Sequence, residues 1–570
     1  MGGFRVLTSA SLAITLLLSM LIPASARAND REILAPNWII YDVTHQAILD
    51  QQLMDQRTPM ASLTKTMTGL LVVEHLSMGD EITIVNGDLV GEASIWVQPG
   101  DVYTVRTLLH GLMMRSGNDA AAALARAAGG SPHRESQAAR DRFVDMMNSR
   151  AAELGIVNTS FENPHGLDGD EHYSTAYDLM LLTQKVLDTP RLMQPFGARH
   201  YSGEGMTFTH TNQLPSQYDG VMGGKTGWTT NAGLCLIQLV QRDGRMLIVV
   251  LLGSTFERWY PDAIDLLDYG WTVPPPATTP ERAAETFEWW RDRTDGPIQR
   301  GLTSRSWLWG PGPHSSVRSE AYVEAPAGER LVQYFDKGRM EINDPDAPIT
   351  SGWYVTGGHL ALELISGRQQ IGDSSFISYS PARVSIAGDP DADTPTYSDL
   401  AALIESNFHQ DGDTITLAFD NQGEIRNRSR FGDYEVVLRD VASPTGHGVA
   451  SVFDDFLDQQ GIVNERGRDV ERPLFAPRYA LIGLPVTEPV WMRAPVGGVN
   501  QDVLAQCFER RCLTYTPSNP DSWRVEMGNI GQHYLEWRQN TSSLSVHERS
   551  RWPVGPGQTS TLKTVAQTPQ

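Results

Sequence analysis

Two apolar runs separated by a tight-turn signal constrain the fold of this chain most strongly. Leu234 to Val240 and Met246 to Leu252 are almost wholly hydrophobic, and the stretch between them contains Asp243-Gly244. This combination predicts two buried antiparallel strands joined by a hairpin. Two shorter strands are expected near the start of the same region, at 38–41 and 47–49.

Helical periodicity fills most of the sequence between these two pairs of strands. Apolar residues recur at helical spacing over 61–76, 105–128 and 136–154. Helices combined with antiparallel strands indicate an α/β layered domain that ends near Gly270. A β-rich region is expected after it, because short apolar or aromatic runs there are broken by Gly, Pro and Asp.

The length of 570 residues indicates three or four folded parts. A run of prolines and threonines begins at Thr272 and predicts a stiff linker. The second boundary is expected at the Gly/Asp/Pro-rich stretch that starts at Gly388. The expected organisation is a signal peptide over 1–28, an α/β domain over 29–271, a linker over 272–282, β-rich regions over 283–387 and 388–541, and a disordered tail over 542–570.

The first 28 residues have the pattern of a secretory signal. Arg5 precedes an apolar run from Leu12 to Ile22, and small residues follow up to Ala28, where cleavage is expected. An uncleaved anchor is the alternative, but the run is shorter than the roughly 20 residues that a spanning helix needs. No later segment is apolar enough to span a bilayer. We therefore expect an exported, periplasmic or extracellular protein that is soluble or associated with the cell wall and lacks a transmembrane segment once mature.

The formal net charge of −22 makes nucleic acid an unlikely partner, because a phosphate backbone would be repelled. Export also bears on the cysteines, since Cys507 and Cys512 could join in an oxidising compartment. On a regular helix their Cα atoms would lie roughly 8 to 9 Å apart, beyond the reach of about 7 Å for a disulfide. A bond therefore requires a turn over 508–511, whereas a helix there would leave two free thiols. Cys235 is expected to be a buried small hydrophobe.

Three short motifs in the α/β domain carry the candidate chemistry: Ser62-x-x-Lys65, Ser116-Gly117-Asn118 and Lys225-Thr226-Gly227. Ser and Lys three residues apart on a helix share one face, so the lysine nitrogen can reach the serine hydroxyl and act as its base when neutral. Burial and a neighbouring cation both lower a lysine pKa enough for this role.

The rarity of lysine sharpens this interpretation. Arginine supplies most of the 46 basic residues, and the chain has only five lysines, at 65, 185, 225, 337 and 563. Arginine cannot lose its proton at accessible pH, so a site that needs a neutral amine must keep lysine. Each motif alone could have a purely structural role: Ser62 at a helix N-terminus, Ser116-Gly117-Asn118 at a helix kink and Lys225-Thr226-Gly227 in a turn. Together, in this order, they match the set found in penicillin-binding proteins.

With these motifs the chain resembles the D-alanyl-D-alanine carboxypeptidases, the low-molecular-weight penicillin-binding protein family, from about Trp38 to Trp271. The segments that carry the resemblance are Pro59 to Lys65, Arg115 to Ala120, Asn163 to Leu167, Ser174 to Asp178 and Gly224 to Thr229. The resemblance implies a serine peptidase with an antiparallel sheet, helices on both of its faces and a helical subdomain. It also implies peptidoglycan stem peptides as substrates, β-lactams as inhibitors and no cofactor.

The resemblance further implies a role for each matching residue. Ser62 is expected to attack the penultimate D-Ala carbonyl, Lys65 to take its proton and Ser116 to relay a proton to the leaving amine. Asn118 would orient Lys65 and the substrate amide, Lys225 would supply positive potential, and Thr226 would bind the terminal carboxylate. The backbone N–H groups of Ser62 and of Trp228, which follows Gly227, are the expected oxyanion hole. Arg258 is a second candidate for the carboxylate, with a surface salt bridge as the equal alternative.

The same part of the sequence also bears on other functions. A class A β-lactamase would need a Glu that activates water, and in Glu153 to Asn158 the Glu and Asn are one residue too far apart for that loop. His165 and His172 match no usual metal ligand spacing, which favours a hydrogen-bonding role in their loop. Endopeptidase action on cross-links and a non-catalytic wall-binding protein both stay open. In the C-terminal half, the clustered tryptophans indicate core packing more than a glycan-stacking platform.

Overall fold

The computed structural model describes residues 33–349, 351–389, 394–406, 408–420, 422–439, 444–541 and 545–548. The expected signal peptide, residues 390–393 of the expected second boundary and nearly all of the expected tail lie outside these ranges.

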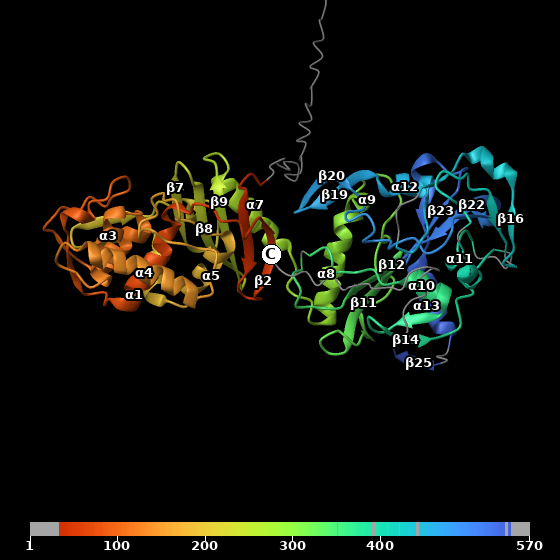
Figure 1. Cartoon of the computed structure of the whole chain (residues 1–570), viewed down its shortest axis with the longest axis horizontal. Coiled ribbons are helices and arrows are strands. Elements are labelled where there is room, and N and C mark those ends of the chain that lie inside the picture. The colour runs from red at the N-terminus through yellow and green to blue at the C-terminus, as the bar shows by residue number, and fades with distance from the viewer. Residues whose placement is uncertain are drawn as a thin grey trace, which may run out of the picture. The chain divides into compact units, whose positions relative to one another are not determined.

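A five-stranded antiparallel sheet forms the centre of the N-terminal region, in the order β2-β1-β9-β8-β7 (Figure 1). Its strands are β1 (Asn37–Asp42), β2 (Ala47–Gln52), β7 (Val221–Thr229), β8 (Gly233–Arg242) and β9 (Arg245–Ser254). The predicted hairpin is confirmed, and its turn holds Asp243 and Gly244 at φ 49° and 82°, the left-handed region that suits this sequence. Both short N-terminal strands are also present where they were predicted.

Alternate side chains of the central strands enter two different cores, as the two-residue period of a strand requires. On one face, Ile237 and Val250 pack with the helices that follow β2. On the other face, Leu236 and Val249 pack with Leu266 of α7. Figure 1 shows α7 on one side of the strands and α1, α3, α4 and α5 on the other. The predicted α/β fold with helices on both faces of the sheet is therefore confirmed.

Short strands and helices complete the N-terminal region. The helices are η1 (Ala61–Thr64), α1 (Lys65–His75), η2 (Asn86–Asp88), α2 (Val105–Met114), α3 (Asn118–Ala128), α4 (Gln137–Glu153), α5 (Ala176–Leu187), α6 (Pro190–Gly197), η3 (Leu214–Ser216) and α7 (Trp259–Thr272). Two hairpins accompany them, β3 (Glu81–Thr83) with β4 (Val102–Thr104) and β5 (His200–Gly203) with β6 (Met206–Thr209). The single helical run expected over 105–128 is in fact two helices, because the chain turns sharply at Ser116.

The C-terminal region is rich in strands, as its composition indicated. A three-stranded sheet joins β10 (Arg318–Ala321), β11 (Glu329–Phe335) and β12 (Gly338–Ile342). A six-stranded sheet has the order β16 (Ile425–Asn427), β15 (Leu417–Phe419), β21 (Val490–Val496), β22 (Val499–Cys507), β23 (Cys512–Tyr515) and β24 (Val525–Met527). The smaller pairings involve β13 (Arg368–Gln370), β14 (Ser375–Ser378), β25 (Ser545–Glu548), β17 (Leu438–Arg439), β18 (Val449–Ala450), β19 (Gln460–Glu465) and β20 (Arg468–Pro473).

Helices also occur in this region, where the sequence pattern indicated mainly strands. They are α8 (Pro280–Thr294), α9 (Gly296–Gln299), α10 (Leu360–Ser366), η4 (Tyr397–Leu400), α11 (Ala401–Ile404), η5 (Ser429–Tyr434), α12 (Ser451–Leu457), η6 (Asp521–Trp523) and α13 (Ile530–Asn540). Helix α8 begins at Pro280, within the stretch expected to be a linker, with Thr279 as its N-cap. Proline in the first turn is compatible with a helix because the first N–H groups have no intrahelical acceptor.

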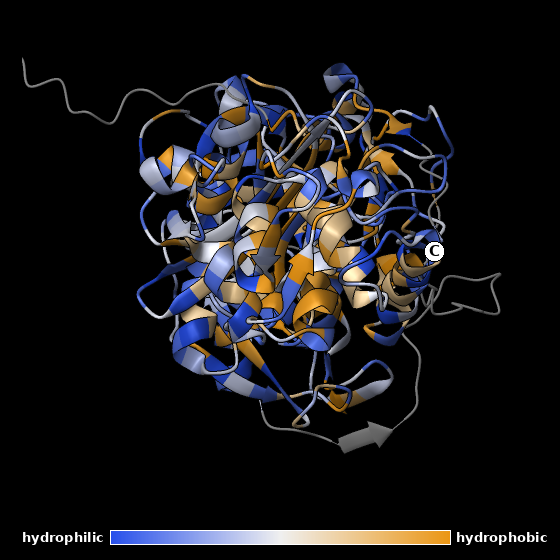
Figure 2. Ribbon diagram, turned by 90° about the vertical axis from the view of Figure 1, so that its left-hand side faces the viewer, coloured by the Kyte–Doolittle hydropathy of each residue, from blue (hydrophilic) through white to orange (hydrophobic). Residues whose placement is uncertain are grey.

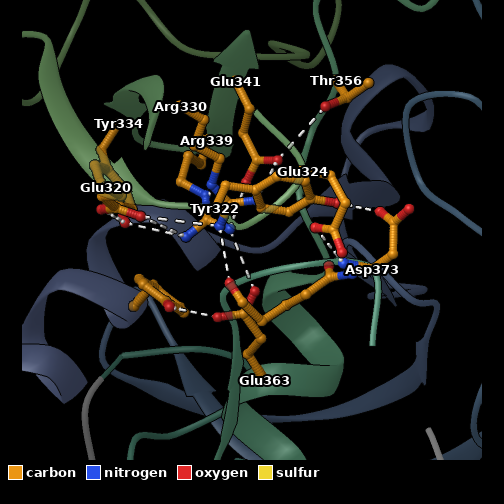
Figure 3. Close-up of polar contacts among 12 residues, drawn as sticks. Glu320, Tyr322, Glu324, Arg330, Tyr334, Arg339, Glu341, Thr356, Glu363 and Asp373 are labelled. Atoms are coloured by element: carbon orange, nitrogen blue, oxygen red, sulfur yellow. Dashed lines mark hydrogen bonds and ion pairs between the residues drawn. The ribbon is translucent and has the colours of Figure 1, made fainter. Parts of the chain in front are cut away.

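A buried ion-pair network ties strands β11 and β12 to helix α10 (Figure 3). The Arg339 guanidinium is fully buried and contacts Glu363 at 3.2 Å and, more closely, Glu341. Arg330 pairs with Glu341 at 3.1 Å, and the hydroxyl of Tyr534 donates to Glu363 at 2.5 Å. Removing one member would leave an uncompensated buried charge, which typically costs about 3–5 kcal/mol. The network therefore fixes how these elements pack together.

The cysteines lie as the sequence led us to expect. Cys507 ends β22 and Cys512 begins β23, the two are paired across the hairpin, and they form a disulfide with Cα atoms 3.9 Å apart. Residues 508–511 thus form the required hairpin tip. Cys235 is a buried free thiol, and burial raises its pKa to about 12.

The surface and the interior separate clearly in the end-on view. In Figure 2 hydrophobic residues, in orange, gather in the middle, while hydrophilic residues, in blue, dominate the outer loops. Among the described residues, no helix is both long enough and apolar enough to cross a bilayer.

Candidate active site

Ser62 and Lys65 lie at the junction between the 3₁₀ turn η1 and helix α1. The Lys65 Nζ donates to Ser62 Oγ at 2.8 Å, as the three-residue spacing predicted. Just before the serine, Ala61 has a φ of 49°, a conformation that costs an alanine free energy and that occurs often at functional sites. Helix α1 is buried from Lys65 to Val73, which fixes the position of the serine against the core.

Lys65 is enclosed by acceptors. In addition to Ser62, its Nζ donates to Asn118 Oδ1 at 2.8 Å and closely to the backbone carbonyl of His165. Asn118 is itself oriented, because its Nδ2 donates to the carbonyl of Gly91 at 2.8 Å. The amide of the second motif therefore holds the lysine of the first motif.

The second and third motifs meet at Ser116. This residue lies between α2 and α3 with φ 61°, a conformation that only a few per cent of residues other than glycine adopt. Lys225 Nζ donates to Ser116 Oγ at 2.9 Å and to the carbonyl of Thr226 at 2.7 Å. The Thr226 hydroxyl lies 3.0 Å from that of Thr211.

Strand β7 passes very close to the nucleophilic turn, and Gly227 makes this possible. A Cβ at Gly227 would lie 3.0 Å from the Ser62 backbone nitrogen and 3.2 Å from the Met60 carbonyl oxygen. A side chain here would push the two segments apart by a few tenths of an ångström, so glycine permits the closest approach. The glycine of Lys-Thr-Gly thus brings the β7 backbone next to the Ser62 N–H group.

The pKa values of Lys65 and Lys225 are both lowered. Burial lowers the pKa of Lys65 well below its usual value, and the nearby positive charge of Lys225 lowers it further. Burial alone lowers the pKa of Lys225 to about 7. Neither side chain is exposed to solvent. A neutral Lys65 next to a protonated Lys225 is therefore accessible near neutral pH.

These groups line one cleft with a volume of about 440 Å³. Ser62, Ser116, Asn118, Thr226, Gly227 and Trp228 all line it, together with Thr229 and Trp259. Lys65 and Lys225 lie behind its wall and donate hydrogen bonds to Ser62 and Ser116. The sequence motifs thus converge on a single site.

Arg258 is the one predicted site residue that the structure does not bring to this cleft. Its guanidinium contacts Asp262 at 2.6 Å and Asp265 at 3.7 Å, at the start of α7. Of the two alternatives for this residue, this arrangement corresponds to the salt bridge.

Several residues that line the cleft were not singled out by the motifs, among them Glu92, Arg115, His165 and Thr211. Glu92, Arg115 and Thr211 line its wall, and His165 contributes both to the wall and to the hold on Lys65. Arg115 and His165 lie inside segments that carried the family resemblance, so that signal could have identified them. Glu92 and Thr211 come from loops, and no motif marks them.

The histidines of the 163–172 loop make local hydrogen bonds, as expected. His172 Nδ1 accepts from the Glu162 N–H at 3.0 Å and its Nε2 lies 2.8 Å from Thr64 Oγ1. Burial, followed by the charge of Lys65, lowers the pKa of His165 to about 3, so this ring is neutral at neutral pH. Within the described ranges, no group of His, Cys, Asp and Glu side chains has the arrangement of a metal site.

The Glu considered for a β-lactamase role is also accounted for. Glu153 is exposed at the end of α4, where it pairs with Arg150 at 2.9 Å. It does not line the cleft. The cleft combines a serine, a lysine whose pKa is lowered and a second lysine that donates to the Ser116 hydroxyl. This arrangement is suited to acyl transfer.

Comparisons with known proteins agree with this geometry. Residues 24–255 match the family model of the D-alanyl-D-alanine carboxypeptidase family, peptidase S11. The D-alanyl-D-alanine carboxypeptidase of Streptomyces sp. strain K15 is 32% identical over 241 residues, which are 38% of this chain and 81% of that protein. DacF of Bacillus subtilis, also named a D-alanyl-D-alanine carboxypeptidase, is 34% identical over 212 residues, 35% of this chain and only 52% of DacF.

A solved structure is also similar to part of this chain. The D-alanyl-D-alanine carboxypeptidase from Mycobacterium tuberculosis is 30% identical, and the match covers 44% of this chain and 96% of that one with a TM-score of 0.40.

Proposed function

Because the chain belongs to the D-alanyl-D-alanine carboxypeptidase family of serine peptidases, we propose that it removes the terminal D-alanine from peptidoglycan stem pentapeptides through an acyl-enzyme on Ser62. The observation that carries this proposal is the 2.8 Å hydrogen bond from Lys65 Nζ to Ser62 Oγ. It joins a serine in an open cleft to a lysine whose pKa is lowered by burial.

In the acylation step, neutral Lys65 takes the hydroxyl proton of Ser62 while Oγ bonds to the carbonyl carbon of the penultimate D-Ala. The negative charge that develops on the carbonyl oxygen is stabilised by the backbone N–H groups of Ser62 and Trp228. The close passage of Gly227 at Ser62 supports this pair of donors. One such donor is worth about 2.7–4 kcal/mol of transition-state stabilisation.

Collapse of the tetrahedral intermediate breaks the C–N bond and releases D-alanine. The leaving amine receives the proton through Ser116, whose hydroxyl accepts from Lys225 at 2.9 Å. The terminal carboxylate binds at Thr226, close to the positive charge of Lys225. Lys225 is therefore most useful in its protonated form.

Hydrolysis of the ester completes the cycle. Water gives a proton to Lys65 and adds to the acyl carbon, and the Ser62 Oγ–C bond then breaks as Oγ regains a proton. The tetrapeptide product leaves with a new carboxylate. β-Lactams would acylate the same serine, because their ring amide occupies the place of the scissile peptide.

The proposal includes export to the compartment where peptidoglycan lies. The signal pattern over 1–28 and the disulfide between Cys507 and Cys512 both support it, because such bonds persist in oxidising compartments.

Release of D-alanine from a synthetic pentapeptide tests the function. The full chain should release one D-alanine per peptide and leave a tetrapeptide, and Ser62→Ala should release none. If cross-linked dimers are cleaved while pentapeptide is left intact, the protein is an endopeptidase. Absence of both reactions would indicate a non-catalytic wall-binding protein.

A further inference from the structure

A second cavity lies wholly in the C-terminal region, away from the motifs of the catalytic cleft. Its volume is about 320 Å³, within the roughly 300–1,000 Å³ range of small-molecule sites. Helix α8, the β19–β20 hairpin, the segment after Pro473 and residues 352–357 form its walls.

Three tryptophans from separate parts of the sequence line this cavity: Trp290, Trp309 and Trp353. Trp309 is buried, whereas Trp353 is 60% exposed. A large exposed indole at the mouth of a cavity offers a flat apolar face to a ligand. This is the surface on which the C–H face of a sugar ring stacks.

The cavity wall also carries a polar side chain, Asn464. Its Oδ1 accepts from the Gly467 N–H at 3.0 Å, which leaves the Nδ2 group as a donor for a ligand oxygen. The wall thus combines an aromatic face with hydrogen-bonding capacity.

The charge on the wall is positive, although the whole chain has a formal net charge of −22. Arg472 is paired with Glu465 at 3.0 Å. Arg293 forms no ion pair with any described side chain, and its guanidinium lies 4.7 Å from the ring centre of Trp290 and 5.4 Å from that of Trp289. The Arg293 guanidinium, next to an aromatic wall, can therefore pair with a carboxylate of a ligand.

From these features we propose that this cavity binds an N-acetylated, carboxylate-bearing saccharide, namely the muramyl sugar of peptidoglycan glycan strands. A sugar ring stacks on Trp353, an acetamido or hydroxyl oxygen accepts from Asn464 Nδ2, and the lactyl carboxylate pairs with Arg293. The choice of a wall saccharide rests on the proposed function. Because a stem peptide is attached through the lactyl carboxyl group, the site would take stretches of glycan from which the stem peptide has been removed and would so hold the protein on the wall.

Titration calorimetry on the full chain tests this site with three probes. They are peptide-free glycan strands, whose muramyl carboxylates are free, neutral chitotetraose, and a stem pentapeptide, the last one titrated into penicillin-treated protein. Because the glycan strands carry no stem peptide, their binding reports on the cavity whether or not Ser62 reacts. Intact-mass detection of a penicillin adduct scores the proposed peptidase function separately.

We expect the glycan strands to bind most tightly. Trp353→Ala should weaken glycan binding by about tenfold or more, as truncation of a stacked aromatic anchor does. Arg293→Gln should weaken glycan binding by about tenfold and chitotetraose binding by less than about twofold, since only the former carries the carboxylate. The matched controls Trp96→Ala and Arg142→Gln, which change exposed residues elsewhere, should leave both affinities unchanged.

Thermal unfolding of each variant shows whether the fold is retained. Glycan binding that is unaffected by Trp353→Ala and Arg293→Gln in folded protein would overturn the proposal. Equal affinity for chitotetraose and glycan strands would overturn the role of the carboxylate. Binding of the pentapeptide alone would overturn the assignment to a saccharide.

Discussion

Replacing Lys65 by arginine separates its role as a base from its positive charge. Arginine keeps a cation at this position but cannot lose its proton at accessible pH. General-base assistance contributes about 10²–10⁴-fold to a rate, which is about 2.7–5.4 kcal/mol of activation free energy at 1.36 kcal/mol per decade. We therefore expect Lys65→Arg to slow acylation by about 10²–10⁴-fold, close to the effect of Lys65→Ala.

The surroundings of Lys65 also bear on the design of this experiment. Its side chain is fully buried, and Ser62, Asn118 and the His165 carbonyl surround Nζ. The larger guanidinium will therefore strain the site, at a cost of about 1–3 kcal/mol in the free energy of unfolding. Lys185→Arg on helix α5 is the matched control, since Lys185 does not contact the cleft.

Acylation is measured by stopped flow with a fluorescent penicillin, and thermal unfolding verifies the fold. The reasoning is refuted if folded Lys65→Arg keeps more than about one tenth of the wild-type acylation rate, because general-base loss alone should exceed that.

Three further experiments test other parts of the account. Acylation by the wild type should fall above about pH 7 as Lys225 loses its proton, whereas Lys225→Arg should keep its rate at alkaline pH because arginine stays charged; parallel pH profiles would contradict this. Alkylation of the denatured, unreduced protein should label Cys235 alone, and labelling of Cys507 and Cys512 would contradict the disulfide. The fragment 29–271 should fold and react with penicillin by itself, and an insoluble or unreactive fragment would mean that later residues complete its core or cleft.

The hydrophobic pattern predicted four of the five strands of the central sheet, and it missed β7, whose glycines and lysine interrupt any apolar run. Strand β9 alternates buried residues between two cores, and the Asp243-Gly244 turn adopts the positive φ angles that its sequence favours. These features depend on local periodicity and turn chemistry, which one sequence contains. The spacing of Cys507 and Cys512 showed only that a disulfide would need a turn over 508–511, with a helix and two free thiols as the alternative, and the structure has the hairpin tip and the bond.

The features that escaped prediction depend on contacts between distant segments. The backbone turn at Ser116 divides one periodic run into two helices, and helix propensity gives no sign of it. The His165 carbonyl meets Lys65 across 100 residues of sequence. For Arg258 the sequence left a carboxylate-binding role and a salt bridge as equal alternatives, and only the fold places its guanidinium beside Asp262. Helix α8 was not predicted, because the proline-rich stretch that ends at its first turn indicated a linker.

The site of penicillin attachment tests the central claim most directly. The full chain is incubated with benzylpenicillin, and intact-mass analysis is followed by peptide mapping of the adduct. The account predicts one covalent penicilloyl group per chain, carried by Ser62, and no adduct in the Ser62→Ala variant. An adduct on any other residue, or an adduct that persists in Ser62→Ala, would contradict the assignment of Ser62 as the nucleophile.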